Sequence, residues 1–166
     1  MREWGCEVGV EDEGIEWGWC AGGDWWTTVG GWQPAKTRCR GGLKRLVEYI
    51  KSKGMIAGLW LEVEVMGMDS RLAASLPDDW FFMRNGRRVI DHGRYQLDFS
   101  NPAVAAFADG LVDRLISDHG IGYPMIVHNI QCGRGQETGA KSFGDRLLRP
   151  TRPYLPATSS TCAGRP

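Results

Sequence analysis

The sequence predicts an α/β fold in which parallel strands alternate with helices. Two apolar runs of strand length, Met55–Leu61 and Tyr123–Val127, each follow a segment with helical periodicity. Nearly continuous apolar runs of this length are typical of strands that are buried on both faces of a parallel sheet. Strands and amphipathic helices that alternate in this way indicate βαβ units, and 166 residues suffice for one domain with a core.

The N-terminal part combines one short strand with a long loop. Cys6–Val10 has the composition of a strand, and a segment rich in glycine and tryptophan follows to about residue 40. Eight tryptophans are present, and six of them precede residue 33. These large apolar side chains either fill a core or form a surface on which sugar rings stack. The many glycines beside them favour a loop.

The first helix is predicted within residues 41–54, which end in a glycine. Its apolar stripe repeats at helical spacing and consists of Leu43, Leu46, Val47 and Ile50. The strand Met55–Leu61 follows at once. Residues 70–77 have a weaker helical pattern, Asn85-Gly86 predicts the two-residue turn of a hairpin, and residues 94–99 are typical of another short strand.

The clearest helix spans residues 100–120. Asn101 suits its N-cap, Pro102 its first turn and Gly120 its end. Its apolar stripe consists of Val104, Phe107, Leu111, Val112 and Leu115. The strand Tyr123–Val127 follows this helix, and Pro124 within it favours a position at the edge of a sheet.

Charge and cysteine usage exclude several classes of protein. Twenty basic and twenty acidic side chains cancel, so the basic surplus of a nucleic-acid-binding protein is missing. No apolar segment reaches the roughly 18 residues of a membrane span, and the start lacks the apolar run of a signal peptide. The five cysteines form no CxxC pair, and no phosphate loop or metal motif occurs. We therefore expect a cytoplasmic protein with free thiols, no metal and no cofactor.

Functional residues are expected after the C-terminal ends of the strands. These places are residues 11–14, 60–66, 91–98 and 127–133. Asp12 and Glu13 are adjacent acids that can accept hydrogen bonds from two neighbouring sugar hydroxyls, although a solvated acidic turn is the alternative. Trp60 offers an aromatic wall.

Further polar residues follow the second and third strands. Glu62 and Glu64 alternate on one face of the extended chain, where a carboxylate is costly unless it is paired or wet. Arg94 would hold a carboxylate or hydroxyls, or would form a structural salt bridge. His128 and Asn129 end the third strand, and a lone histidine there is more often structural than catalytic.

Four segments match a known pattern in order. They are GGDWWTTVGGWQP, GGLKRLVEYIKSKGMIAGLWLEVEVM, LPDDWFFMRNGRRVIDHGRYQLDFSNP and SFGDRLL. They resemble the catalytic domain of family 36 glycoside hydrolases, the bacterial α-galactosidases or melibiases, from Cys6 to Leu148. The resemblance implies a partial (β/α)8 TIM barrel in residues 1–148 and retaining hydrolysis of α-galactosides by two carboxylates about 5–5.5 Å apart. Residues 149–166 have no apolar period and are expected to be a disordered tail.

The resemblance also implies a substrate-binding set. The first strand of this family ends in a DDGW-like motif that binds galactose hydroxyls. Asp12 and Glu13 fall in that register with Ile15 in place of the tryptophan, and Glu16–Trp19 is a second candidate. The later GLW and GR-x-Q segments and the tryptophan-rich loop add further members to this set. The expected substrate-binding residues are Asp12, Glu13, Trp25, Trp60, Glu64, Arg94 and Asn129.

The position of the family's nucleophile lacks an acid. That nucleophile lies on a strand that ends like YIKxDxN. When YPMIVHN is laid on this pattern, Met125 takes the place of the lysine and Val127 that of the aspartate, while Tyr123 and Asn129 match. We therefore expect no catalytic carboxylate in this chain and negligible hydrolysis.

Three interpretations follow from the resemblance, and an unrelated enzyme on a small doubly wound sheet is a fourth. The first is an α-galactosidase-like fragment that resembles the enzymes but lacks activity, because a full barrel takes roughly 200–250 residues and the strand carrying the acid/base is not included. The second is a non-catalytic module that binds α-galactoside sugars. The third is a truncated remnant that self-associates, or needs a complementing barrel fragment, through open strand edges.

Overall fold

The computed structural model describes residues 12–16, 18–20, 24–35 and 41–128. The expected strand Cys6–Val10, Asn129 and the expected tail at 149–166 lie outside these residues. The domain boundary at residue 148 also lies outside them. These expectations therefore stay predictions.

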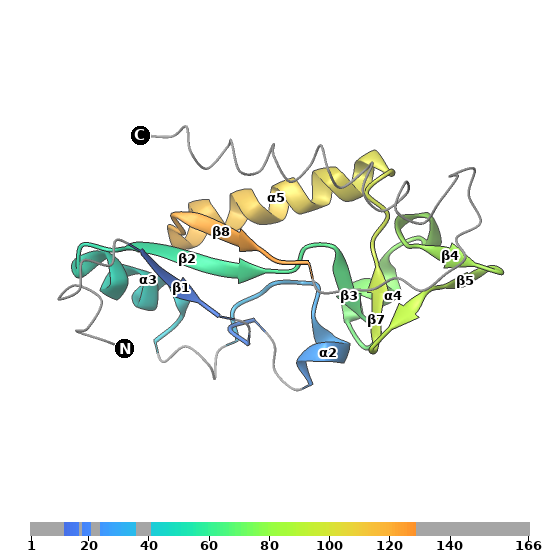
Figure 1. The fold of residues 1–166 in the computed structure, drawn as a ribbon, viewed down its shortest axis with the longest axis horizontal. Coiled ribbons are helices and arrows are strands. Elements are labelled where there is room, and N and C mark those ends of the chain that lie inside the picture. Colours follow the sequence, from blue (N-terminus) through green and yellow to red (C-terminus); the bar gives the residue numbers. More distant parts are fainter. Residues whose placement is uncertain (1–11, 17, 21–23, 36–40, 129–166) are drawn as a thin grey trace.

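A parallel sheet is the centre of the fold (Figure 1). It contains β1 (Asp12–Ile15), β2 (Ile56–Leu61) and β8 (Tyr123–Ile126) in the order β1-β2-β8, and both pairings are parallel. Helix α3 (Leu43–Ser52) connects β1 to β2, and α5 (Pro102–His119) precedes β8. The prediction of parallel strands alternating with helices is confirmed. These three strands form an open sheet, and the barrel remains an expectation.

Both long helices form where their sequence predicts them. The side chains of Leu43, Val47 and Ile50 bury one stripe of α3. In α5 the side chain of Asn101 accepts a hydrogen bond from the Ala103 amide, and Gly120 ends the helix with φ 70°, a left-handed conformation that glycine adopts without strain. Its buried stripe consists of Val104, Ala108, Leu111, Val112 and Leu115. No described helix is both long and apolar enough to cross a bilayer.

The first described strand, β1, covers residues that were expected in a loop. Asp12 pairs with Ile56 and Ile15 pairs with Leu59, so residues 12–14, expected in a loop, belong to β1. This strand is defined by its pairing with β2. Because β2 lies far away in the sequence, the local pattern of apolar residues does not predict the pairing. The C-terminal end of β1 is consequently Ile15, and Glu16 begins the loop that follows.

Strand β8 is an edge strand of the described sheet. It pairs with β2 alone, and its four residues are half-buried, so the expected burial on both faces is wrong. The expected edge position of Pro124 is confirmed. The Tyr123 ring packs over Gly58 on β2, where an added Cβ would lie 2.2 Å from the ring carbon Cζ. Only glycine admits this contact.

An insert between β2 and α5 forms a second sheet. Strands β3 (Val65–Gly67), β7 (Arg94–Gln96) and β6 (Ile90–Asp91) are antiparallel in the order β3-β7-β6. The predicted hairpin is confirmed as β4 (Met83–Arg84) and β5 (Arg87–Arg88), with positive φ at Asn85 and Gly86. The short helices α4 (Arg71–Ser75) and η1 (Asp78–Trp80) complete the insert. Figure 1 shows it beyond the C-terminal ends of β2 and β8.

The glycine- and tryptophan-rich segment contains one helical turn. Helix α2 (Trp25–Thr28) begins at Asp24, whose side chain accepts a hydrogen bond from the Trp26 amide. It packs against the backbone of β3. The contact is so close that a Cβ added to Gly67 would lie 2.2 Å from the Thr27 carbonyl oxygen. The segment was expected to be a loop throughout. Three of its tryptophans belong to the core: Trp19, Trp25 and Trp32.

Candidate functional site

The candidate site lies at the C-terminal ends of β2 and β8. The Val127 amide donates a hydrogen bond to the Leu61 carbonyl at 2.8 Å, so the strand pairing continues to Val127, where the resemblance implies an acid. The turn that leaves β2 places two carboxylates beside it, on Glu62 and Glu64. Both are buried, with 0% and 2% exposure. They were expected to alternate along a strand, but they belong to a turn between β2 and β3.

Glu62 forms a buried ion pair with Arg94. The Nη1 atom of Arg94 donates to Oε2 of Glu62 at 2.7 Å, and both side chains are almost wholly buried. The guanidinium lies over the ring of Trp26, 4.4 Å from its centroid, and 5.5 Å from that of Trp25. Of the roles considered for Arg94, the structure shows the one in which it holds a protein carboxylate. This pair ties the insert to the end of β2.

Glu64 pairs with His128. The Nδ1 atom of His128 lies 2.8 Å from Oε1 of Glu64, and the imidazole is 38% exposed, whereas the carboxylate is buried. The hydrogen bond to Glu64 raises the pKa of His128, partial burial opposes this, and the negative charges of Glu64 and Glu62 raise the pKa further. The sequence did not predict this pair, because its members lie on different strand ends.

Trp60 is surrounded by other tryptophans. The indole Nε1 of Trp19 donates to the Trp60 carbonyl at 2.9 Å, and the rings of Trp25 and Trp32 lie 5.4 and 6.1 Å from that of Trp60. Trp60 itself is 8% exposed. Trp60 and Trp25 are thus held together with Arg94, and little of the Trp60 ring is open to solvent.

The remaining expected site residues are less close to this group. Asp12 and Glu13 lie within β1, opposite Ile56 and Ala57, near the start of β2. The alternative candidate, Glu16, follows the last residue of β1 and is exposed. Asn129 lies outside the described residues. The structure therefore brings together Trp25, Trp60, Glu64 and Arg94 of the expected set.

A cavity of about 370 Å³ opens beside the tryptophan cluster. This volume is near the lower end of small-molecule sites. Trp32, which contacts Trp60, forms one wall, and the polar part of the lining includes Thr28, Gln33, Asp69, Ser70 and Arg71. The Cys20 thiol also lines it, and burial raises its pKa to about 12, so it stays protonated at neutral pH. The cavity therefore offers a polar lining that includes one acidic and one basic side chain, Asp69 and Arg71.

Comparison with known proteins gives a consistent family. The family model described as Melibiase matches residues 1–141. An α-galactosidase from Escherichia coli is 32% identical over 127 residues, which are 74% of this chain and 18% of that protein. The chain spans less than a fifth of the length of the curated relatives it matches.

Solved structures show a shared fold. The crystal structure of the α-galactosidase from Lactobacillus brevis superimposes with a TM-score of 0.75 at 22% identity, covering 96% of this chain and 22% of that one. A variant of the family 36 α-galactosidase from Geobacillus stearothermophilus, in complex with raffinose, gives a TM-score of 0.73 at 21% identity, with 95% and 23% of the two chains covered. At these identities the likeness concerns the fold.

Proposed function

Because the chain belongs to the melibiase family, we propose that it is part of an α-galactosidase-like catalytic domain that binds α-galactosides without hydrolysing them. The ligands would be sugars with a terminal α-galactosyl unit. A family 36 relative has been crystallised with raffinose and another α-galactosidase with stachyose, which supports this ligand class.

The observation that carries the proposal is Val127 at the end of β8. Its backbone is bonded to Leu61, so its register against β2 is defined. A valine has no lone pair with which to attack an anomeric carbon, and a retaining enzyme needs a carboxylate there to form its glycosyl-enzyme intermediate. Glu62 and Glu64 lie nearby, but they are engaged with Arg94 and His128. Neither is free to replace the nucleophile.

Several residues that the resemblance implies for binding lie close together. Trp25, Trp60 and Arg94 lie together, and a polar cavity adjoins the tryptophan cluster through Trp32. A pocket of this size can enclose one sugar ring, with hydroxyls facing the polar lining. The methionine at position 125, where the resemblance implies a lysine, removes one hydrogen-bond donor, so we expect weak affinity.

The test separates binding from hydrolysis. Purified full-length chain is titrated calorimetrically with galactose, with glucose as the epimeric control, and is assayed with an aryl α-galactoside. We expect saturable heat with galactose, little with glucose and no release of the aryl alcohol above the buffer rate. Appreciable turnover would refute the loss of hydrolysis. A flat titration on protein with a cooperative melt would refute the binding function.

A further inference from the structure

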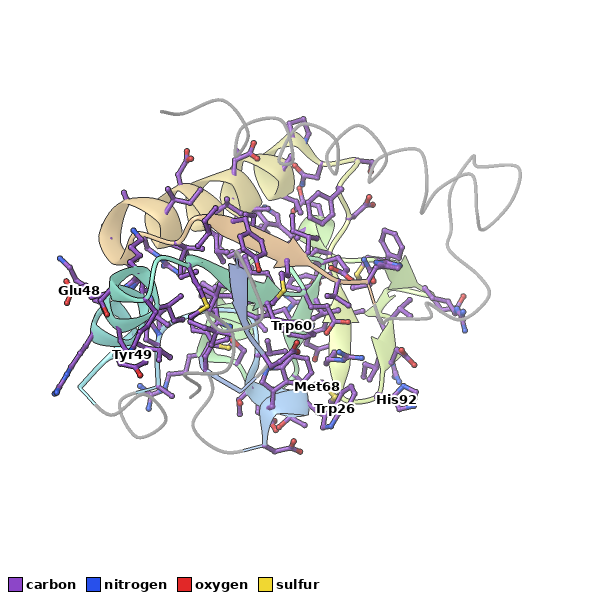
Figure 2. All side chains as sticks on the ribbon, turned by 60° about the vertical axis from the view of Figure 1, so that its left-hand side comes forward. Trp26, Glu48, Tyr49, Trp60, Met68 and His92 are labelled. Atoms are coloured by element: carbon purple, nitrogen blue, oxygen red, sulfur yellow. The ribbon has the colours of Figure 1, made fainter. Side chains whose placement is uncertain are left out.

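We propose that Trp26, together with Met68 and His92, forms a platform on which a second sugar ring of an α-galactosyl oligosaccharide stacks. This inference rests on the proposed function, and it adds a binding surface outside the strand-end site. Figure 2 shows the three side chains close together, below Trp60. They come from α2, from the residue after β3 and from the turn between β6 and β7.

The platform is exposed, unlike the neighbouring tryptophans. Trp26 is 48% exposed and Met68 40% exposed, whereas Trp19, Trp25 and Trp32 are buried. The His92 side chain is 76% exposed, and its ring lies 6.3 Å from that of Trp26. The Met68 amide donates to the Gly93 carbonyl at 3.0 Å, which holds the methionine segment beside the histidine turn.

The Trp26 ring is fixed from behind. The Arg94 guanidinium lies 4.4 Å from its centroid and is itself held by the buried carboxylate of Glu62. The Trp25 ring meets it edge-on at 5.3 Å. A cation that lies over one face of an aromatic ring is attracted to the ring. A tryptophan side chain held in this way loses little conformational freedom when a ligand covers its exposed surface. The exposed indole surface is thus already ordered for binding.

The size and chemistry of the platform fit a sugar. About half of a tryptophan side chain is on the order of 100 Å² of apolar surface, enough for the C–H face of one pyranose. A protein partner would need about 800 Å², far more than Trp26 and Met68 provide. The imidazole of His92 and the carboxylate of Asp91, 2.8 Å apart, lie at the edge of the platform, where hydroxyl groups need donors and acceptors.

The platform also lies on chain segments that contribute to the proposed ligand cavity. Thr28 on α2 and Asp69 after β3 line the cavity, and they lie on the same two segments as Trp26 and Met68. The Asp69 amide donates to the Thr27 carbonyl at 2.8 Å, which joins these segments. One oligosaccharide can therefore be served by both features, with its galactosyl unit in the cavity and a following ring on Trp26.

The experiment compares galactose with raffinose, an α-galactosyl trisaccharide, by calorimetry on the full chain. We expect raffinose to bind roughly three- to tenfold more tightly, the range of one aromatic stacking contact. Trp26→Ala should abolish this advantage and leave the affinity for galactose unchanged. Tyr49→Ala is the matched control, because Tyr49 is 41% exposed but lies on α3, away from the platform (Figure 2).

The outcomes separate the two proposals. If galactose binds but raffinose has no advantage, or keeps it in Trp26→Ala, the platform is overturned and the proposed function stands. If neither sugar binds, both are overturned. If Trp26→Ala fails to fold, His92→Ala is the deciding variant. Because His92 is exposed, its removal should reduce the raffinose advantage without affecting the melt. An unchanged advantage would overturn the platform. A dimer that Trp26→Ala dissociates would show that a second copy occupies it.

Discussion

His128 and Val127 are adjacent at the end of β8, and they differ in what they can contribute. Val127 contributes only apolar contacts and a backbone hydrogen bond to Leu61, whereas His128 carries a titratable ring that is paired with Glu64. Acidic side chains are nevertheless present in this region. They are two carboxylates of the β2–β3 turn, and they pair with Arg94 and His128.

The pH dependence of the Glu64–His128 pair can be predicted. The pKa of His128 is raised above the ordinary value of about 6.5, first by the hydrogen bond to Glu64 and then by the charges of Glu64 and Glu62. A raised pKa in the folded state means that protonation favours folding. The stabilisation is fully present below pH about 6.5 and is lost as the pH rises through the raised value.

An NMR titration of the His128 ring measures this directly. We expect a midpoint above the ordinary value in the wild-type chain. Glu64→Gln should lower it, because the amide can still accept the hydrogen bond but carries no charge. A wild-type midpoint at or below the ordinary value would show that Glu64 and His128 are not paired in solution.

At the scale of elements, Arg94 is the connection between the insert and the parallel sheet. It lies on β7, pairs with Glu62 at the end of β2 and packs against the two tryptophans of α2. Because Glu62 and Arg94 are both buried, removing one leaves the other charge without its main counterion. We expect Arg94→Met to destabilise the fold by about 3–5 kcal/mol, as measured by chemical denaturation.

Asp78→Asn is the matched control for this substitution. Asp78 also pairs with an arginine at 2.7 Å, but its side chain is 66% exposed. Exposed pairs contribute about 1 kcal/mol or less, because water and salt screen them. If both substitutions cost the same, the buried pair does not connect the two sheets in the way its geometry indicates.

The sequence predicts those elements whose signals are local. Apolar spacing and capping residues such as Asn101 and Gly120 are enough to predict α3 and α5, and Asn85-Gly86 predicts its hairpin. The position of β1 was missed because it depends on pairing with β2. The short strand expected at residues 94–99 contains β7, but its partners β3 and β6 were missed because strands of two or three residues have no measurable period.

The same distinction holds for the candidate site. Motif resemblance identified Trp60, Glu64 and Arg94, which do lie close together. It did not identify the partners of the two carboxylates, because Arg94 and His128 reach them from other strands. The resemblance also did not predict which tryptophans are buried and that Trp26 is exposed. Neighbouring indoles with the same local sequence differ only in the groups that pack over them.

At the scale of the whole molecule, the proposed ligand recognition depends on the insert as much as on the parallel strands. Arg94, His92 and Met68 all belong to the segment between β2 and α5, and α2 packs on β3 through Gly67. The contact between Trp80 and Phe107, with centroids 5.7 Å apart, fixes this segment to α5 as well. Any loosening of the insert would therefore change the site and the stability together.

The open edges of the parallel sheet lead to a final prediction. Within the described part of the chain, β1 and β8 each pair with β2 alone, so each has an unpaired side. Unpaired strand edges promote association with other chains. We expect the weight-average mass in sedimentation equilibrium to rise with protein concentration. Ile126→Lys should reduce this association, because it places a charge on the half-buried edge strand β8.

Ile56→Lys provides the comparison for this test. Ile56 is 53% exposed and lies on β2, the central strand, so the same charge is introduced away from the edge of the sheet. Its association should match that of the wild-type chain, while both variants keep a cooperative melt in near-ultraviolet circular dichroism. Equal association of the two variants would mean that the strand edge is not the contact. A wild-type chain that is monomeric at every concentration would mean that the edge of β8 is already covered within the molecule.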